Sequence, residues 1–384
     1  MEQYSNIKKI VFLTGTRADF GKLKSLIEIL NQHPQFEVHL FATGMHLDKK
    51  YGYTVHEIEK CGYQNIYKYI NHDKESMMDI TLSRTIEGFA NYVRLVQPHL
   101  IVVHGDRIEA LAGATVGALN NILVAHIEGG ELSGTVDELI RHAVSKLSHT
   151  HFVANAEAKQ RLMQMGECDE SVYIIGSPDM DAMLSEHLPP LEEVKKYYEI
   201  PFEEYAISLF HPVTTEVDNM DVYAAAYVDA IRESAINYVA VYPNNDVGSD
   251  FILSKLLRLK EYNHIRLFPS MRFEYFLVLL RHAKFIVGNS STGIREAGYY
   301  GVPAVNVGTR QMGRSLNEDI INCGYAKQEI LSAITKATHA TVEKQQLFGN
   351  GNSDKQFLSI VQQRHFWQTP KQKQFAANAC NEVV

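Results

Sequence analysis

Cysteine is scarce in this 384-residue sequence, and long apolar runs are absent. The four cysteines, Cys61, Cys168, Cys323 and Cys380, lie far apart and form no C-x-x-C pair, so we expect reduced thiols rather than disulfides or a zinc site. No uncharged apolar run of about 18 residues is available to cross a membrane. The first six residues lack the apolar centre of a signal peptide, which favours a cytoplasmic protein.

Charge and histidine content narrow the possible ligands. The net charge of −8 argues against a nucleic-acid surface, so an anionic substrate would need a local basic pocket. The 17 histidines form no H-E-x-x-H motif, and G-x-G-x-x-G is also missing. We therefore expect neither a metal ion nor a cofactor. His149 and His151 flank Thr150 at the edge of an apparent strand, where packing is the expected role.

Short β-branched apolar runs alternate with helical patterns along the chain, as in parallel sheets covered by helices on both faces. The runs lie at 10–13, 38–41, 100–103, 122–125, 151–153, 206–210, 238–242, 265–268, 285–287 and 304–307. Helical patterns include 22–31, 85–97 and 137–148. Because the chain is too long for one compact core, we predict two Rossmann-like, doubly wound α/β domains that face a cleft.

Proline marks the predicted domain boundary. Pro178, Pro189 and Pro190 make residues 176–190 resemble a linker. We predict an N-terminal domain at 1–175 and a C-terminal domain at 176–354. Residues 355–384 should pack back on the first domain, because the chain after Gly349 is helical and amphipathic.

A Gly/Ser-rich segment at 288–303, G-N-S-S-T-G-I-R-E-A-G-Y-Y-G-V-P, follows one of the predicted strands. A turn of this kind leaves backbone N–H groups unpaired at the positive end of a helix dipole, where a pyrophosphate fits. Glu296, about two turns into the predicted helix, can accept hydrogen bonds from a ribose. The alternative is an ordinary turn in which serine caps the helix.

Other polar segments also follow predicted strands, and ligands of such sheets bind at the carboxyl ends of strands. They are T-G-T-R-A-D at 14–19, H-G-D-R at 104–107, H-I-E-G-G-E at 126–131, H-P-V-T at 211–214 and Y-P-N-N-D at 242–246. Together these segments predict one cleft.

The chain resembles the hydrolysing UDP-N-acetylglucosamine 2-epimerases, the sialic-acid-pathway enzymes of encapsulated bacteria and of the animal bifunctional epimerase/kinase. The matching segments are R-A-D at 17–19, H-G-D-R at 104–107, H-I-E-G-G-E at 126–131, G-T-V-D-E-L-I-R-H-A at 134–143, H-P-V-T-T at 211–215, G-N-S-S-T-G-I-R-E at 288–296 and G-T-R-Q-M-G-R at 308–314. The resemblance implies a glycosyltransferase-B-type fold, a UDP-sugar substrate and a homodimer or homotetramer. No kinase-like segment follows, so only the epimerase activity is implied.

That resemblance implies an elimination. UDP-N-acetylglucosamine would lose UDP across C1 and C2, and water would add to the 2-acetamidoglucal while C2 is reprotonated on the opposite face, giving N-acetylmannosamine. A carboxylate near C1 and C2 can take the proton and stabilise positive charge on the sugar. The candidates are Asp106, Glu128, Glu131 and Asp137. Glu128 is the first choice, with Asp106 as its partner in one pocket. Each can instead be a solvated loop carboxylate, an alternative that fits Glu131 best.

Charge and the family match together give the expected binding residues. The UDP ligands would be Arg17, Arg107, His211, Asn244, Ser290, Ser291, Glu296 and Arg310. His211 can donate to a departing phosphate oxygen, unless it is only a capped loop histidine. The family match alone places His46, Arg141 and His142 on the sugar side. Arg141 follows Asp137 by one helical turn, so an ordinary ion pair between them is the alternative.

Other functions are less consistent with these residues. Non-hydrolysing 2-epimerases show G-T-R-P-E, H-V-E-A-G-L-R-T and D-S-G-G-I-Q-E at the three places where this chain has T-R-A-D, H-I-E-G-G-E and N-S-S-T-G-I-R-E. A glycosyltransferase of the same fold has no reason to match H-I-E-G-G-E. A catalytically inactive nucleotide-sugar sensor need not keep Asp106, Glu128 and His211. A hydrolysing relative acting on UDP-2,4-diacetamido-trideoxyglucose, in the legionaminic acid pathway, remains an alternative.

Overall fold

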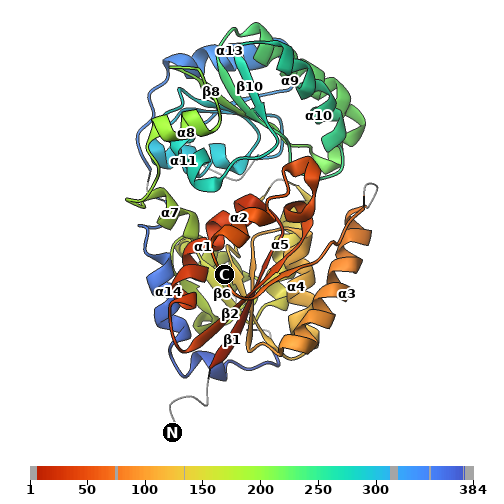
Figure 1. The fold of residues 1–384 in the computed structure, drawn as a ribbon, viewed down its shortest axis with the longest axis vertical. Helices are drawn as coiled ribbons and strands as arrows, with labels where there is room; N and C mark the ends of the chain where they lie inside the picture. Colours follow the sequence, from red (N-terminus) through yellow and green to blue (C-terminus); the bar gives the residue numbers. More distant parts are fainter. Residues whose placement is uncertain are drawn as a thin grey trace, which may run out of the picture.

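The computed structural model describes residues 7–73, 77–133, 135–311, 319–345, 347–374 and 376. Figure 1 shows two α/β units stacked along the long axis, each built on one parallel sheet with helices on both faces. The predicted pair of doubly wound α/β domains is confirmed. Among the described residues, no helix is both long and apolar enough to cross a membrane.

The first sheet contains seven parallel strands. They are β1 (Lys8–Thr14), β2 (Phe36–Ala42), β3 (Ile66–Lys68), β4 (Leu100–His104), β5 (Leu123–Ile127), β6 (Thr150–Val153) and β7 (Val172–Ile174). Their spatial order is β3-β2-β1-β4-β5-β6-β7. One face packs against α1 (Arg17–Asn31), α2 (Val55–Lys60) and α14 (Ser353–Val361), and the other against α3 (Met78–Val96), α4 (Ile108–Leu119) and α5 (Val136–Leu147). Helix α6 (Ala156–Gln164) packs beside β6 and β7.

The second sheet contains six parallel strands. They are β8 (Ala206–Leu209), β9 (Tyr238–Val241), β10 (Ile265–Phe268), β11 (Ile286–Gly288), β12 (Ala304–Val307) and β13 (Ile321–Cys323), in the spatial order β10-β9-β8-β11-β12-β13. One face packs against α9 (Met220–Glu233), α10 (Ser249–Leu256) and α13 (Lys327–His339), and the other against α8 (Leu191–Tyr197), α11 (Phe273–Arg281) and α12 (Glu296–Tyr300).

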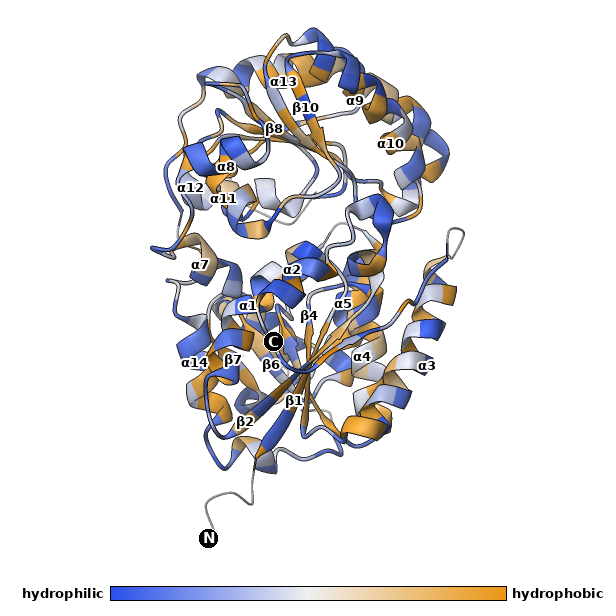
Figure 2. Cartoon of the chain, viewed as in Figure 1, coloured by the Kyte–Doolittle hydropathy of each residue, from blue (hydrophilic) through white to orange (hydrophobic). Residues whose placement is uncertain are grey.

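Apolar residues concentrate in the central strands of both sheets (Figure 2), which are buried on both faces. Every run predicted to be a strand overlaps a strand of the structure. Strands β3, β7 and β13 were not predicted. Each has three residues, of which at least two are partly or fully exposed, so they lack the continuous apolar signal of a buried strand.

Two helices begin earlier than predicted. Helix α1 starts at Arg17 rather than Lys22, because the Thr16 hydroxyl accepts a hydrogen bond from the Asp19 N–H (3.1 Å) and caps the helix. Helix α3 starts at Met78 rather than Thr85.

The segment 176–190 was predicted to be a linker, but it contains helix α7 (Pro178–Met183). Proline at the first helical position is compatible with a helix start, and Asp179 and Met180 are buried. Helix α14 packs against α1 and buries Phe357 and Val361 in the core of the first sheet. The chain therefore crosses back to the first unit near its end, as Figure 1 shows in blue.

Candidate active site

The loops after the strands of the two sheets meet between the two units. Strands β4 and β5 pair in parallel with His104 beside Ile127, so their loops leave the same sheet edge. On the facing side, Gly288 at the end of β11 lies beside Leu209 of β8. Gly288 has a φ of 141°, and a Cβ there would lie 2.0 Å from the Leu209 carbonyl oxygen, so only glycine fits this strand end.

Glu128, just after β5, is buried and has a left-handed backbone with a φ of 64°. Its Oε1 accepts hydrogen bonds from Arg295 (2.8 Å) and the Ser177 hydroxyl (2.9 Å), and the Lys22 Nζ lies 3.4 Å away. Burial opposes ionisation, yet Arg295, Lys22 and His104 together hold the pKa of Glu128 well below its usual value. Glu128 is therefore a fixed carboxylate. A strained non-glycine residue at such a point is typical of functional sites.

His104 bridges two carboxylates at the end of β4. Its Nε2 lies 3.3 Å from Glu128 Oε2, and its Nδ1 lies 2.9 Å from Asp19 Oδ1. Burial alone would lower the pKa of His104, but the two carboxylates raise it to about 9. The imidazole is therefore protonated at neutral pH.

Asp106 and Glu128 are linked through Arg141. The Arg141 Nη1 donates to the Glu128 carbonyl oxygen (2.6 Å), and its Nη2 donates to the Asp106 carboxylate. Asp106 also accepts from the Ser133 hydroxyl (3.1 Å). Asp106 and Glu128 therefore share one arginine, and their partnership as acid and base stays a prediction. The alternative ion pair between Arg141 and Asp137 is wrong, because Arg141 turns to Asp106.

Asp137 is an acid whose environment opposes ionisation. Its Oδ2 pairs with the Arg310 Nη2 at 2.9 Å. Burial, followed by the negative charge of Asp106, raises the pKa of Asp137 despite Arg310. Asp137 and Glu128 thus have pKa values displaced in opposite directions, an arrangement that can divide proton transfer from charge stabilisation.

Glu131 is buried, at 7% exposure, so its reading as a solvated loop carboxylate is wrong. Its Oε2 accepts a hydrogen bond from the Arg295 Nη1 at 2.5 Å.

His211 follows β8 and is held by two asparagines. Its N–H donates to Asn289 Oδ1 (2.6 Å), and the Asn244 N–H donates to His211 Nδ1 (3.0 Å). Burial, together with Arg310 and Arg107, holds the pKa of His211 well below its usual value. The neutral ring accepts at Nδ1 and therefore carries its proton on Nε2, where it can act as a donor.

Arg107 connects the two units. Its Nη2 donates to Asn245 Oδ1 in the loop after β9 (2.6 Å), its Nε lies 3.4 Å from Glu109 Oε2, and its Nη1 lies 3.9 Å from Asp246 Oδ1. Although burial opposes the charge, these carboxylates raise the pKa of Arg107, so its positive charge is retained at the interface.

The glycine- and serine-rich loop begins with a short 3₁₀ turn, η6 (Ser291–Gly293). The Ser290 hydroxyl accepts from the Thr292 N–H (3.3 Å) and caps this turn. Glu296 is the first residue of α12, so its predicted position two turns into a helix is wrong. Its buried Oε1 lies 3.6 Å from the Lys22 Nζ, and burial raises its pKa.

The predicted sugar-side histidines have other partners. His46 is fully buried, with its ring nitrogens 3.1 Å from Thr14 Oγ1 and 2.8 Å from Thr54 Oγ1, and burial lowers its pKa to about 4. The His142 Nε2 lies 3.4 Å from Glu138 Oε1 on α5. Their sugar-side roles stay predictions.

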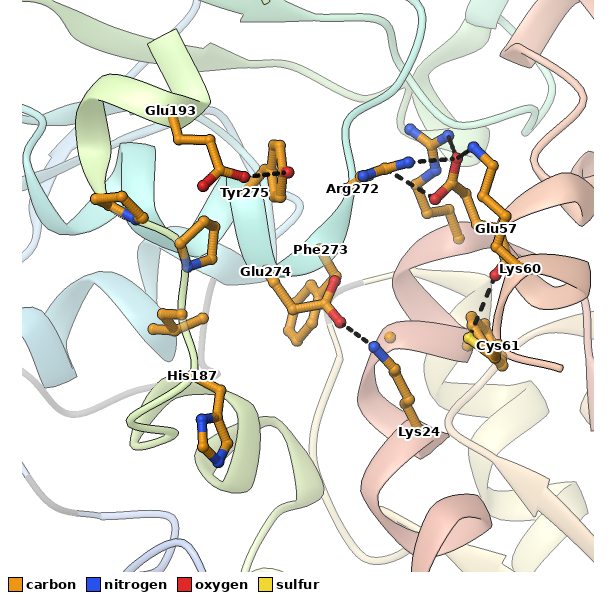
Figure 3. Close-up of a pocket in the computed structure, with 16 residues that line it drawn as sticks. Lys24, Glu57, Lys60, Cys61, His187, Glu193, Arg272, Phe273, Glu274 and Tyr275 are labelled. Atoms are coloured by element: carbon orange, nitrogen blue, oxygen red, sulfur yellow. Dashed lines mark hydrogen bonds and ion pairs between the residues drawn. The ribbon is translucent and has the colours of Figure 1, made fainter. Parts of the chain in front are cut away.

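A cavity of about 620 Å³ lies between α1 and α2 on one side and α11 and residues 187–190 on the other (Figure 3). Arg17 lines it, with its Nη2 3.9 Å from Glu57 Oε1. The Lys24 Nζ and Glu274 Oε1 pair across it at 2.6 Å. Arg17 thus follows strand β1 and faces this cavity.

Several residues of the site were not predicted. His104 and Arg295 stand inside the matched segments H-G-D-R and G-I-R-E, but neither received a role. Ser177 and Asp179 lie in the segment interpreted as a linker. Nothing in the sequence pattern singles out Lys22, which lies within 3.6 Å of Glu128, Asp179 and Glu296.

A profile of the UDP-N-acetylglucosamine 2-epimerase family matches residues 28–362. The chain belongs to this family. It is 50% identical over 373 residues to the UDP-N-acetylglucosamine 2-epimerase of Neisseria meningitidis serogroup B, covering 96% of this chain and 99% of that relative. It is 31% identical to the hydrolysing UDP-N,N'-diacetylbacillosamine 2-epimerase of Legionella pneumophila (92% and 96% covered) and to polysialic acid biosynthesis protein P7 of Escherichia coli (93% and 89%).

Solved structures with this fold include two UDP-N-acetylglucosamine 2-epimerases. The Methanocaldococcus jannaschii enzyme, in complex with UDP-N-acetylglucosamine and UDP, has a TM-score of 0.79 at 22% identity, covering 92% of this chain and 99% of that one. A Neisseria meningitidis enzyme bound to UDP-N-acetylglucosamine has a TM-score of 0.75 at 18% identity, with the same coverage. These likenesses show the shared fold. In this member of the UDP-N-acetylglucosamine 2-epimerase family, the described residues contain no cluster of three His, Cys, Asp or Glu suited to a metal ion.

Proposed function

We propose that the protein is a hydrolysing UDP-N-acetylglucosamine 2-epimerase that releases UDP and N-acetylmannosamine, the first step of sialic acid biosynthesis. The main support is the arrangement of two buried acids: Glu128 lies 2.8 Å from Arg295 and 3.4 Å from Lys22, and Asp137 lies 2.9 Å from Arg310. The pKa of Glu128 is lowered and that of Asp137 is raised. The 50% identical meningococcal relative bears the name of the same 2-epimerase.

The first step is an elimination. The C2–H and C1–O bonds break, the C1=C2 bond forms, and UDP leaves with the bonding electrons. Asp137 is suited to accept the C2 proton, because its raised pKa makes it a stronger base than an ordinary aspartate. Glu128 stays ionised and stabilises the positive charge that develops on the sugar.

Departing UDP needs cationic and hydrogen-bonding partners. Arg107 and Arg310 carry positive charge to the loops between the units, and His211 offers an Nε2–H donor. Ser290 and Ser291 supply hydroxyl and N–H groups for the pyrophosphate. The remaining proposed nucleotide ligands are Arg17, Asn244 and Glu296.

Water then adds at C1 of the glucal, and C2 takes a proton on the opposite face. The hydrolysing outcome is favoured by T-R-A-D, H-I-E-G-G-E and N-S-S-T-G-I-R-E, which depart from the non-hydrolysing pattern. Relatives from Legionella pneumophila and Campylobacter jejuni are named as hydrolysing 2-epimerases of a diacetamido sugar nucleotide. That substrate is the competing candidate.

Incubation of the purified protein with each sugar nucleotide, followed by identification of the sugar, tests the proposal. We expect UDP and free N-acetylmannosamine from UDP-N-acetylglucosamine, without added metal or nicotinamide. UDP-N-acetylmannosamine as the final product would place the protein among the non-hydrolysing epimerases. Turnover of only the diacetamido substrate would reassign the sugar but retain the reaction.

A further inference from the structure

Arg295 reaches from the nucleotide loop of the second unit into the carboxylate cluster of the first. It is 2% exposed and immediately precedes α12. Its guanidinium contacts Glu131 (2.5 Å), Glu128 (2.8 Å), Asp179 (3.1 Å) and the Ser177 hydroxyl. Such a fork of donors can hold several acceptors in fixed positions.

The same residue is tied to the proposed phosphate site. The Arg295 N–H donates to the Ser291 carbonyl oxygen at 3.0 Å. The guanidinium is therefore carried by the same hydrogen-bonded turn as the serine loop. Its face also stacks on Phe348, 4.6 Å from the ring centre, which restricts the side chain to this direction.

Charge balance makes Arg295 important to Glu128. Four carboxylates, those of Glu128, Glu131, Asp179 and Glu296, share this buried space. Lys22 lies 3.4 Å from Glu128 and Asp179 and 3.6 Å from Glu296. Without Arg295, the nearby cations would be too few to offset the carboxylates, and burial would favour the protonated form of Glu128.

We propose that Arg295 is a positioning residue that keeps Glu128 ionised and oriented when the nucleotide loop is in place, thereby linking the UDP site to the sugar-side carboxylate. This role rests on the proposed 2-epimerase function. Withdrawal of the loop would leave Glu128 with Lys22 and His104 and weaken its capacity to stabilise a cationic sugar.

Every element around Glu128 contributes a charged or titratable group. They are Asp19 and Lys22 on α1, His104 on β4, Glu131 in the same loop, Arg141 on α5, Asp179 on α7, and Arg295 and Glu296 at α12. Arg295 is first among the cations that lower the pKa of Glu128.

The direction of the pH effect follows. In the parent protein, the lowered pKa of Glu128 keeps the carboxylate ionised from neutral pH down into the acidic range. Arg295→Gln removes the nearest cation, so the pKa of Glu128 rises. As the pH is lowered, Glu128 then becomes protonated at a higher pH than in the parent protein. An adjacent opposite charge typically lowers a carboxyl pKa by about 1–3 units, so the pKa of Glu128 should rise by that amount and Glu128 should add its own protonation to that of Asp137 on the acid limb of kcat.

The test is the pH profile of kcat and KM for UDP release by the parent, Arg295→Gln and Arg295→Lys proteins. Arg232→Gln is the control, because Arg232 is partly exposed on α9 and pairs only with its helix neighbours Asp229 and Glu233 among the described ion pairs. We expect Arg295→Gln to lose activity chiefly at low pH and regain part of it at high pH. Arg295→Lys keeps the charge and should retain the parent acid limb. Thermal melting verifies folding.

A uniform loss of kcat at every pH in Arg295→Gln, with an unmoved acid limb and an unchanged pKa of Glu128, would reduce Arg295 to a packing role. An acid limb shifted equally in Arg295→Lys would also overturn the proposal. If the parent itself turns over no sugar nucleotide, the proposed function fails separately. Carbon-13 NMR titration of glutamate-labelled protein, with Glu128→Gln to assign the signal, then still decides whether Arg295 controls the pKa of Glu128.

Discussion

At the residue scale, two buried acids behave differently because their neighbours differ. Glu128 has Arg295 and Lys22 within 3.4 Å and a protonated His104 at 3.3 Å. Asp137 pairs with Arg310, but the negative charge of Asp106 raises its pKa. A pKa difference of one unit corresponds to about 1.4 kcal/mol between the two protonation states. Both acids are buried, and more cations lie near Glu128 than near Asp137. Asp137 therefore holds a proton more readily than Glu128.

Glu128→Gln should retain UDP affinity but lower turnover by about 10²–10⁴-fold, because it removes the anion that faces the developing positive charge. Calorimetry with UDP and a UDP-release assay measure the two quantities. Glu157→Gln is the control, since that side chain is 76% exposed on α6. Near-normal turnover in Glu128→Gln would show that another carboxylate carries this role.

Glu296→Ala should weaken UDP binding. A hydrogen bond to a charged acceptor contributes roughly 1.5–3 kcal/mol, which is about 10- to 100-fold in affinity. Glu296 also lies 3.6 Å from Lys22, so its removal changes the charge around Lys22 as well as the nucleotide site. Measuring both UDP affinity and turnover separates the two effects. A fall in turnover with an unchanged UDP dissociation constant would assign Glu296 to the Lys22 cluster instead of the ribose.

The sequence predicts some of the residues that form the site, but it does not predict which of them contact each other. Asp106, Glu128 and His211 were found because each follows an apolar strand run. One partner of Glu128 is Arg295, 167 positions away, on an element of the other unit. No local spacing encodes such a contact, and none encodes the position of Arg141 between Glu128 and Asp106.

At the element scale, helix α7 and the N-terminus of α14 stabilise each other through Asp181. Its Oδ1 accepts from the Ser353 N–H (2.9 Å), and its Oδ2 accepts from the Asp354 N–H (3.0 Å) and the Ser25 hydroxyl (2.9 Å). The carboxylate therefore caps a helix from outside it. Helix α7 was not predicted because its segment is rich in proline, although Pro178 occupies the first helical position, where helices tolerate proline.

Asp181→Ala should lower the free energy of unfolding by about 1–3 kcal/mol, because it leaves partly buried donors of α14 and α1 without this acceptor. Denaturant unfolding measures the change. Asp169→Ala is the matched control, since that side chain is 59% exposed and pairs only with Lys159 among the described ion pairs. Equal unfolding curves for the two variants would contradict the capping role.

At the scale of the whole molecule, the two units are joined by charged contacts around the site. Besides Arg295, Arg107 reaches Asn245, Arg310 reaches Asp137 and Lys50 pairs with Asp250 (2.6 Å). These contacts can exchange with water when the units separate, unlike a large apolar interface. The fold class was predictable because buried parallel strands produce a strong apolar pattern. The interdomain contacts were not, since they depend on how two separately folded units meet.

Saturating UDP should bring the two units closer together and shorten the particle, because the second unit would bind the nucleotide while the first unit faces the sugar. Small-angle scattering with and without UDP measures this change. Identical curves would mean that the two units are fixed relative to each other.

Isotope exchange at C2 tests the elimination most directly. The protein is incubated with UDP-N-acetylglucosamine in deuterium oxide, and the released sugar is analysed by NMR. The account predicts free N-acetylmannosamine with deuterium at C2, because the proton passes through a carboxyl group that exchanges with solvent. N-acetylmannosamine that keeps its original hydrogen at C2 would contradict the elimination and the carboxylate roles built on it.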